Sequence, residues 1–283
     1  MRANVQNNAY LHAVFSDFVY FCNMSIVRAK KSLGQHFLRD QNIARKITES
    51  LLPMTHEVLE IGPGMGVLTR HLLTNPDFSV HAIDIDRESI EYLHSELPEH
   101  RERILYGDFL KMDITELYKE PFSVIGNLPY NISSQIFFRI IENRQLVKQV
   151  VCMIQKEVAE RIAAPYGNKS YGILSVFLQT FYDIEYLFTV GEKVFDPPPK
   201  VKSAVIRLTR NGRQELGCDE KLFFNVVKTG FNQRRKTLRN SIRGLIPPGY
   251  ESNYLNMRPE QLDIDAFLHF CTELQEAREI LKE

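Results

Sequence analysis

The chain has 283 residues, of which 44% are hydrophobic and 25% are charged, with 14 glycines and 13 prolines. This composition is typical of a folded globular protein, and it excludes collagen-like, low-complexity and disulfide-stapled chains. The 35 basic residues balance the 35 acidic ones, which excludes a uniformly cationic protein but says nothing about how the charges are distributed. The length predicts about two domains, or one large domain with an appendage.

The cysteines and the apolar runs exclude further classes. The four cysteines lie far apart without a C-x-x-C pair, so we expect neither a disulfide framework nor a metal site, and a reducing cytosol fits this usage. No apolar run approaches the roughly 18 residues of a membrane span. Residues 1–23 lack a convincing secretory signal, and we expect them to be an extension outside the fold.

From about residue 40 the sequence alternates helical and strand-like segments. Asp40 is a suitable N-cap for a helix that carries Ile43, Ile47 and Leu51 at helical spacing. We expect further helices after the glycines at 62–66, at about 87–97 and from Ser133, and strands at 58–61, 78–83, 104–106, 122–125 and 147–154. Strands separated by helices predict βαβ units, which means a parallel sheet with right-handed crossovers.

After residue 180 the pattern changes. Two β-like runs, 181–190 and 202–209, flank a proline run at 197–199, which predicts a stiff connector between antiparallel strands. Residues 211–219 are linker-like, and the remainder is helical with a break at 247–249. The predicted organisation is an extension over 1–23, a main α/β domain over 24–210 and a smaller helical domain over 211–283.

Three polar features follow three successive strands of the predicted sheet. The glycine-rich EIGPGMG at 60–66 allows a tight turn and close approach of backbone N–H groups to a ligand. Asp84 ends the next strand, where a carboxylate can accept hydrogen bonds from ribose hydroxyls, and Asp108 follows the third. Their convergence predicts a site for a nucleoside-bearing cofactor. The missing Lys-Ser/Thr pair excludes a P-loop, and Val67 stands where a dinucleotide fingerprint has its third glycine.

The segment GNLPYNISS at 126–134 follows the fourth strand. An exocyclic adenine amine is a poor nucleophile because its lone pair is delocalised into the ring. The Asn127 side-chain oxygen and the Leu128 carbonyl could accept both amine hydrogens and localise that pair, and Tyr130 offers an aromatic face for the base. The alternative is that Asn127 only caps a turn before the helix at Ser133.

Six segments in order carry a resemblance to a known family. They are KSLGQHFL (31–38), EIGPGMGVLT (60–69), DIDRE (84–88), GNLPYNIS (126–133), QKEVAERI (155–162) and FDPPPKVKSAV (195–205). From about Val27 to the C-terminus the chain resembles the rRNA adenine N6,N6-dimethyltransferases. It most resembles the branch that modifies two adjacent adenosines near the 3′ end of small-subunit (16S) rRNA.

The resemblance implies a Rossmann-like methyltransferase sheet with helices on both faces and S-adenosylmethionine as the methyl donor. The residues that it places at this cofactor are His36, Leu38, Gly62, Gly64, Asp84, Asp108 and Asn127. Asp84 stands where family members commonly carry Glu, and position 36 is Asn in some relatives, so a backbone contact there would tolerate the change. The side chain of His36 has either a functional or a purely structural role.

For the reaction, the resemblance implies Asn127, Leu128, Tyr130 and Phe195 as catalytic residues, with Phe195 facing the target adenine opposite Tyr130. Taken alone, a phenylalanine at a strand edge is more typical of a core. Because the target base must reach the site from a structured RNA, we expect base flipping. The protein would act as a cytoplasmic monomer on pre-30S subunits, with a role in small-subunit biogenesis.

Basic residues cluster at 28–46 and at 221–250, where seven Lys and Arg occur without Asp or Glu, while acidic residues concentrate after residue 250. Arg235, Arg239 and Arg243 recur every four positions, which predicts one face of a helix. The residues expected to grip RNA phosphates are Arg234, Arg235, Lys236, Arg239 and Arg243. The alternative for this face is simple solvation.

Two other functions stay open at this point. One is the related adenine methyltransferase of large-subunit rRNA, the antibiotic-resistance type. GQHFL, the Leu in NLPY and the basic C-terminal segment favour the small-subunit branch instead. The other is a non-catalytic ribosome-assembly factor on the same fold, which would not need Asn127 and Tyr130.

Overall fold

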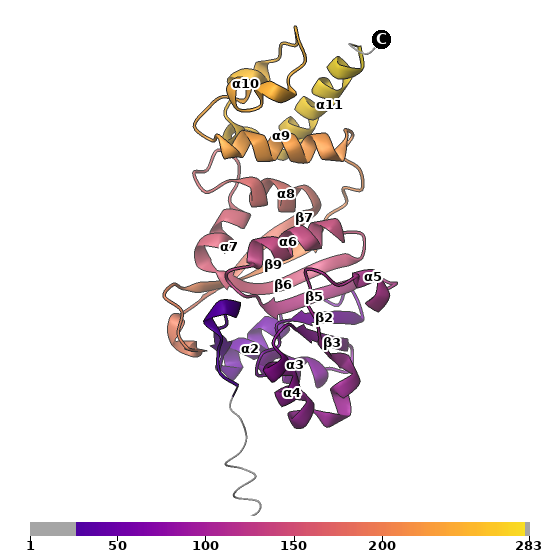
Figure 1. The fold of residues 1–283 in the computed structure, drawn as a ribbon, viewed down its shortest axis with the longest axis vertical. Coiled ribbons are helices and arrows are strands. Elements are labelled where there is room, and N and C mark those ends of the chain that lie inside the picture. The colour runs from indigo at the N-terminus through magenta and orange to yellow at the C-terminus, as the bar shows by residue number, and fades with distance from the viewer. Residues whose placement is uncertain (1–26, 281–283) are drawn as a thin grey trace, which may run out of the picture.

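The computed structural model describes residues 27–280, so the extension expected over residues 1–23 lies outside the described residues. A seven-stranded sheet forms the centre of the molecule (Figure 1). Its strands are β2 (Glu57–Ile61), β3 (Ser79–Asp84), β4 (Ile104–Tyr106), β5 (Phe122–Asn127), β6 (Val147–Gln155), β7 (Tyr182–Val190) and β9 (Ser203–Arg210). Their order across the sheet is β4-β3-β2-β5-β6-β9-β7.

The strands from β2 to β6 pair in parallel, as the βαβ pattern predicts. β9 then runs antiparallel to β6, and β7 runs antiparallel to β9, which confirms the antiparallel pair predicted around the proline run. A separate two-stranded ladder joins β1 (Phe37–Leu38) to β8 (Phe195–Asp196). This ladder holds the N-terminal segment against the proline-rich connector.

The helices occupy the gaps that the sequence pattern indicates. They are α2 (Gln41–Thr48), α3 (Val67–Leu73), α4 (Arg87–Glu96), α5 (Ile114–Leu117), α6 (Ser133–Glu142), α7 (Lys156–Ala163), α8 (Ile173–Phe181), α9 (Glu220–Asn232), α10 (Leu238–Ser241) and α11 (Ile264–Ile280). The Asp40 carboxylate accepts hydrogen bonds from the N–H groups of Asn42 and Ile43, which confirms it as the N-cap of α2. No helix between residues 27 and 280 has both the length and the apolar character needed to cross a membrane.

Helices cover both faces of the sheet, and alternating strand residues explain why. On β5 and β6, Val124 and Val150 face the hydrophobic cluster that includes α6, α7 and α8, whereas Ile125 and Val151 face the cluster that includes α2 and α3. Successive side chains of a strand point to opposite faces, so a strand buried on both sides must be apolar throughout. The predicted α/β class is confirmed.

The C-terminal helices stack beyond α8, farthest from the N-terminal end of the molecule (Figure 1). The ring of Phe177 on α8 lies 6.0 Å from that of Phe223 and 4.5 Å from that of Phe224, both on α9. Buried apolar residues form one continuous cluster from the sheet through α8 into α9 and α11. The two parts of the chain are therefore joined by a hydrophobic core, which holds the C-terminal helices in place relative to the sheet.

The basic helix predicted over Arg235, Arg239 and Arg243 is wrong. α9 ends at Asn232, residues 233–237 form a turn, α10 has four residues, and Arg243 lies in a 3-10 turn. The reason is a long-range contact, because the buried Leu238 donates its N–H to the Met257 carbonyl at 2.8 Å and packs against Gly230. This packing outweighs a local helical periodicity that has little stability of its own.

Candidate functional site

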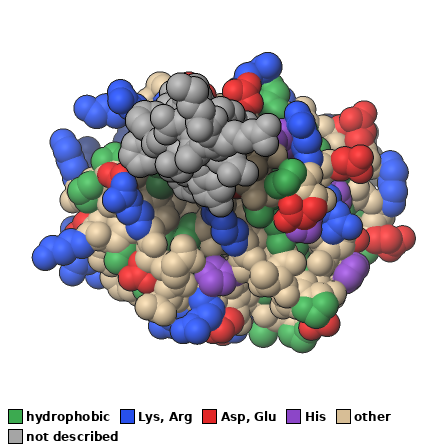
Figure 2. All heavy atoms as spheres, turned by 90° about the horizontal axis from the view of Figure 1, so that it is seen from below, with side chains coloured by type: hydrophobic (Ala, Val, Ile, Leu, Met, Phe, Trp, Pro, Cys, Tyr) green, Lys and Arg blue, Asp and Glu red, His purple; other side chains and the backbone are tan. Residues whose placement is uncertain are grey.

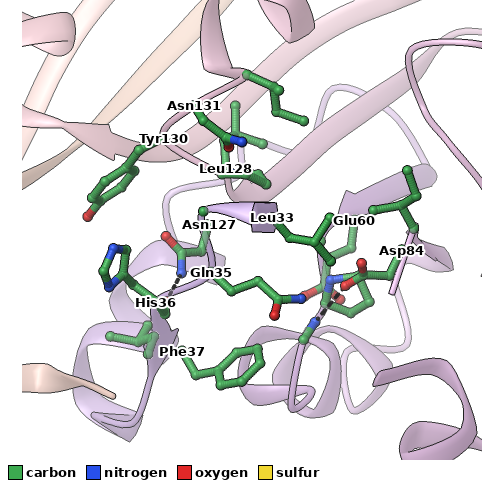
Figure 3. Close-up of a pocket in the computed structure, with 18 of the residues that line it drawn as sticks. Leu33, Gln35, His36, Phe37, Glu60, Asp84, Asn127, Leu128, Tyr130 and Asn131 are labelled. Carbon is green, nitrogen blue, oxygen red and sulfur yellow. Dashed lines mark hydrogen bonds between the residues drawn. The ribbon is translucent and has the colours of Figure 1, made fainter. Parts of the chain in front are cut away.

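A pocket opens at the carboxyl edge of the parallel strands, between the ends of β2, β3 and β5 and residues 32–38 (Figure 3). Open α/β sheets bind their ligands at this edge. The predicted site residues that line the pocket are His36, Leu38, Gly62, Gly64, Asp84, Asp108, Asn127, Leu128 and Tyr130. Residues up to 94 positions apart in the chain are thus brought to a single cavity, as the strand-end argument predicts.

The glycine loop needs glycine for two reasons. Gly62 and Gly64 have φ angles of +71° and +52°, which L side chains rarely adopt. A Cβ on Gly64 would also lie 2.9 Å from the ring of Phe37. The backbone of this loop therefore has no side chains at Gly62 and Gly64, and the N-terminal segment packs directly against it.

Two acids of the predicted set occupy the pocket. Asp84 is 8% exposed, and its carboxylate accepts N–H hydrogen bonds from Gly64 at 3.3 Å and Asp86 at 2.9 Å. Burial raises the pKa of Asp84 above its ordinary value. Asp108 is more open, accepts the N–H of Leu110 at 3.0 Å and lies 3.4 Å from the Lys111 ammonium. Both are placed where a ligand's hydroxyl or amine groups can reach a carboxylate.

Glu60 also lines the pocket, although sequence reasoning did not single it out. It is 1% exposed, and its Oε2 atom has no hydrogen-bond partner among the described residues. Burial, with a smaller contribution from the charge of Asp84, raises the pKa of Glu60 to about 8. The available signal was an acid inside the otherwise apolar run VLEI, because buried acids are rare unless something pairs with them.

Asn127 is oriented by the N-terminal segment. Its Nδ2 group donates a hydrogen bond to the backbone carbonyl of His36 at 2.8 Å (Figure 3). A carbonyl can only accept, so the amide nitrogen faces His36 and Oδ1 is the atom left to accept a hydrogen bond from a ligand. Because His36 contributes its backbone here, another residue type at this position would preserve the contact.

Tyr130 stands at the other side of the pocket, with its ring centroid 5.3 Å from that of His36 and the planes tilted by 33°. Its phenol shares a hydrogen bond with the hydroxyl of Ser203, the first residue of β9. Burial raises the pKa of Tyr130, so the phenol remains protonated. The His36 Nδ1–H donates to the Pro197 carbonyl at 2.8 Å. The imidazole thus links the N-terminal segment to the proline-rich connector.

The structure does not bring Phe195 into the pocket. Its side chain is 4% exposed and packs in the hydrophobic cluster that contains Leu38 and Val205. In the β1–β8 ladder, Phe195 is the register partner of Leu38. The arrangement is the one expected of a core phenylalanine at a strand edge.

The predicted RNA-binding residues fall into two groups. Arg239 forms two hydrogen bonds with the carboxylate of Glu251, at 3.0 and 2.5 Å, and Arg234 lies 3.9 Å from Glu260. Arg235, Lys236 and Arg243 are exposed and form no salt bridge within the described residues. The cluster at 28–46 is also partly neutralised, since Lys30 contacts Asp86 at 2.6 Å and Glu88 at 3.0 Å.

Comparison with known proteins identifies relatives over most of the chain. The profile of the family described as ribosomal RNA adenine dimethylase matches residues 26–277. Ribosomal RNA small subunit methyltransferase A of Parabacteroides distasonis is 56% identical over 254 residues, covering 87% of this chain and 93% of the relative. The protein of the same name from Cytophaga hutchinsonii is 55% identical over 248 residues, covering 86% and 96%.

Solved structures agree with these relatives. A dimethyladenosine transferase from Plasmodium falciparum superimposes with a TM-score of 0.71 at 27% identity, covering 86% of this chain and 98% of that one. The 23S rRNA methyltransferase ErmE superimposes with a TM-score of 0.61 at 26% identity, covering 83% of this chain and 99% of that one. The chain therefore belongs to the ribosomal RNA adenine dimethylase family.

Proposed function

We propose that this protein uses S-adenosylmethionine to dimethylate the N6 amines of two adjacent adenosines near the 3′ end of small-subunit (16S) rRNA, as a cytoplasmic monomer acting on pre-30S subunits during small-subunit biogenesis. The observation that carries the proposal is the orientation of Asn127, whose free Oδ1 lies in the pocket formed by the glycine loop, Asp84 and Tyr130. The names of the relatives that are 55–56% identical support the small-subunit substrate.

The residues present fit the cofactor. The bare backbone of Gly62 and Gly64 leaves room for it, the Asp84 carboxylate can accept from ribose hydroxyls, and Asp108 can accept from an adenine amine. The unpartnered Oε2 of Glu60 leaves a carboxyl oxygen free to bind a polar group of the ligand. When bound, S-adenosylmethionine supplies a methyl group already activated by its sulfonium.

The chain's own contribution to the reaction is positioning. Asn127 Oδ1 and the Leu128 carbonyl would accept the two hydrogens of the target amine, so that its lone pair points at the methyl group. Tyr130 would stack on the flipped base and keep it in the plane of these acceptors. In the second transfer the amine has one hydrogen left, so one of the two acceptors suffices.

The large-subunit alternative is not favoured. The solved 23S rRNA enzyme is 26% identical, whereas the small-subunit enzymes are more than 50% identical over most of their length. The exposed Arg235, Lys236 and Arg243 would bind phosphates of the structured rRNA, which is recognised largely by its shape.

Replacing Asn127 tests the proposed function. Asn127→Ala removes the side-chain acceptor, so transfer of labelled methyl groups from S-adenosylmethionine to undermethylated small subunits should fall at least about 100-fold. Cofactor binding, measured by calorimetry, should largely survive. Asn225→Ala, at an exposed position on α9, is the matched control and should transfer at the normal rate. Near-normal turnover of Asn127→Ala would overturn the role assigned to this side chain.

A further inference from the structure

Tyr130 lies on a loop, although its proposed task demands an accurate position. Residues 128–132 connect β5 to α6 without regular structure. The loop backbone is attached to its surroundings by the Leu128 N–H, which donates to the Met153 carbonyl at 3.0 Å. The side-chain hydrogen bond of Tyr130 with Ser203 is therefore the contact that ties the aromatic ring itself to the sheet.

Ser203 is an unusual residue for its place. It is 0% exposed and is paired on both sides, with Gln155 of β6 and Val190 of β7. Buried positions of a central strand usually carry β-branched apolar residues, as Val205 does two positions further along β9. A buried hydroxyl is destabilising unless it is hydrogen-bonded. Among the described residues its hydrogen-bond partner is Tyr130.

The surroundings make this contact rigid. Ser203 belongs to a strand with neighbours on both sides, so its hydroxyl cannot follow movements of the loop. On the pocket side, the His36 ring lies close to Tyr130 (Figure 3). The His36 ring is itself held by a hydrogen bond to the Pro197 carbonyl. The phenol end of the Tyr130 side chain is thus anchored to the sheet. The same side chain lines the pocket together with Asn127.

We propose that Ser203 is a positioning residue for the methyl transfer: its hydroxyl holds the Tyr130 ring at the height and angle at which the target adenine stacks beside Asn127. The inference rests on the role proposed for Tyr130. Without the Ser203 hydroxyl, the Tyr130 ring rotates more freely and the base spends less time in the reactive geometry. Such a loss affects kcat more than the binding of subunits or cofactor.

A double-mutant cycle tests the proposal, because Ser203→Ala and Tyr130→Phe remove the same hydrogen bond from its two ends. We expect each single variant to lower kcat for small-subunit methylation about tenfold, with KM for subunits and Kd for S-adenosylmethionine unchanged. The double variant should be no slower than either single one. Should Ser203→Ala fail to fold, Tyr130→Phe still tests the bond, since it leaves Ser203 in place.

The matched control is Ser123→Ala. Ser123 on β5 is equally buried, at 1% exposed, and bonds with Thr55 at 2.6 Å and Gln149 at 3.1 Å, away from the pocket. It should lower the melting temperature but leave kcat unchanged. Normal kcat in both single variants, or losses that multiply in the double variant, would overturn the proposal. Tyr130→Ala distinguishes failure of the proposed function from failure of this inference. A normal kcat in Tyr130→Ala would refute the role of Tyr130 itself. A lowered kcat in Tyr130→Ala together with a normal kcat in Ser203→Ala would refute only the role of Ser203.

Discussion

Two of the polar side chains in the pocket, Asn127 and Glu60, differ in how many of their polar atoms form hydrogen bonds within the protein. The amide nitrogen of Asn127 is bonded to the His36 carbonyl, and its Oδ1 atom is the one that we propose accepts a hydrogen bond from the substrate. Glu60 keeps a carboxylate oxygen unpaired in an apolar strand. The place of Asn127 in the pocket was predictable because its segment follows the end of a strand, whereas Glu60 was missed because one acid in a strand also fits a solvent-facing position. The backbone contact of His36 depends on tertiary structure and has no sequence signal.

Glu60 should make the cofactor-free protein less stable at alkaline pH. Its folded pKa is raised from 4.5 to about 8, so the unfolded chain loses this proton first as the pH rises. Between about pH 4.5 and 8 the unfolded state binds fewer protons, and stability falls. At about 1.4 kcal/mol per pKa unit the loss is at most roughly 5 kcal/mol.

Thermal unfolding of Glu60→Gln as a function of pH checks this expectation. Glutamine cannot ionise, so the variant should melt above the parent protein at pH 8.5, and the difference should shrink toward pH 4.5. The parent protein measured in the same buffers is the reference. A difference in melting temperature that stays constant with pH would contradict the assignment.

At the scale of elements, the site depends on how closely β2 and β5 approach each other at their carboxyl ends. A Cβ on Gly126 would lie 2.3 Å from the Ile61 carbonyl oxygen, a distance that real Cβ contacts do not reach. β2 cannot retreat, because it is paired with β3 on its other side. Gly126 precedes Asn127, so the strand contact sets the position of the proposed catalytic side chain.

Gly126→Ala should therefore destabilise the protein by about 1–3 kcal/mol and reduce methyl transfer in the fraction that remains folded. Urea unfolding and the methylation assay measure the two effects. Gly212→Ala is the matched control, since a Cβ there meets nothing within 4 Å and its φ is not left-handed. It should change stability by less than about 0.5 kcal/mol. Equal behaviour of the two variants would exclude the strand contact as the cause.

Element prediction succeeded where local pattern and tertiary packing agree. The parallel strands were recognisable because short apolar runs alternate with helical segments, and Asp40 marks the start of α2. The helix predicted through Arg239 failed because burial of Leu238 and its bond to Met257 turn the chain after α9. The place of Phe195 in the core likewise follows from its pairing with Leu38, which sequence spacing does not show.

At the scale of the whole molecule, the net charge is zero because 35 basic and 35 acidic residues balance. The two kinds of charge are nevertheless distributed unevenly over the surface. On the end of the molecule shown in Figure 2, Lys and Arg side chains gather toward one side and acidic ones are more frequent on the other. Internal pairing reduces the basic surface further, since Lys30 and Arg239 contact carboxylates. The composition therefore excluded a uniformly positive surface. The structure shows which lysine and arginine side chains have no acidic partner among the described residues and can contact phosphates.

This pattern predicts unequal effects of removing arginines. Arg235→Ala or Lys236→Ala should weaken binding to small subunits and reduce the slope of log K against log salt by about 0.7–0.9, the value for one phosphate contact. Arg239→Ala should change the slope less, because Glu251 already neutralises Arg239. Titrations in 50–300 mM salt measure the slopes, with Lys148→Ala on β6 as a control. A larger change for Arg239→Ala than for Arg235→Ala would contradict the prediction.

The β1–β8 ladder has a consequence for how the protein folds during its synthesis. β1 is among the first segments of the described chain to be synthesised, yet its partner Asp196 follows 159 residues after Phe37. β9, which carries Ser203, is made later still and inserts between β6 and β7. A nascent chain that already contains the glycine loop and Asn127 consequently lacks the strand partner of β1 and the Ser203 hydroxyl that bonds with Tyr130. We therefore expect the pocket to reach its final arrangement only after β9, which ends at Arg210, has left the exit tunnel and joined the sheet.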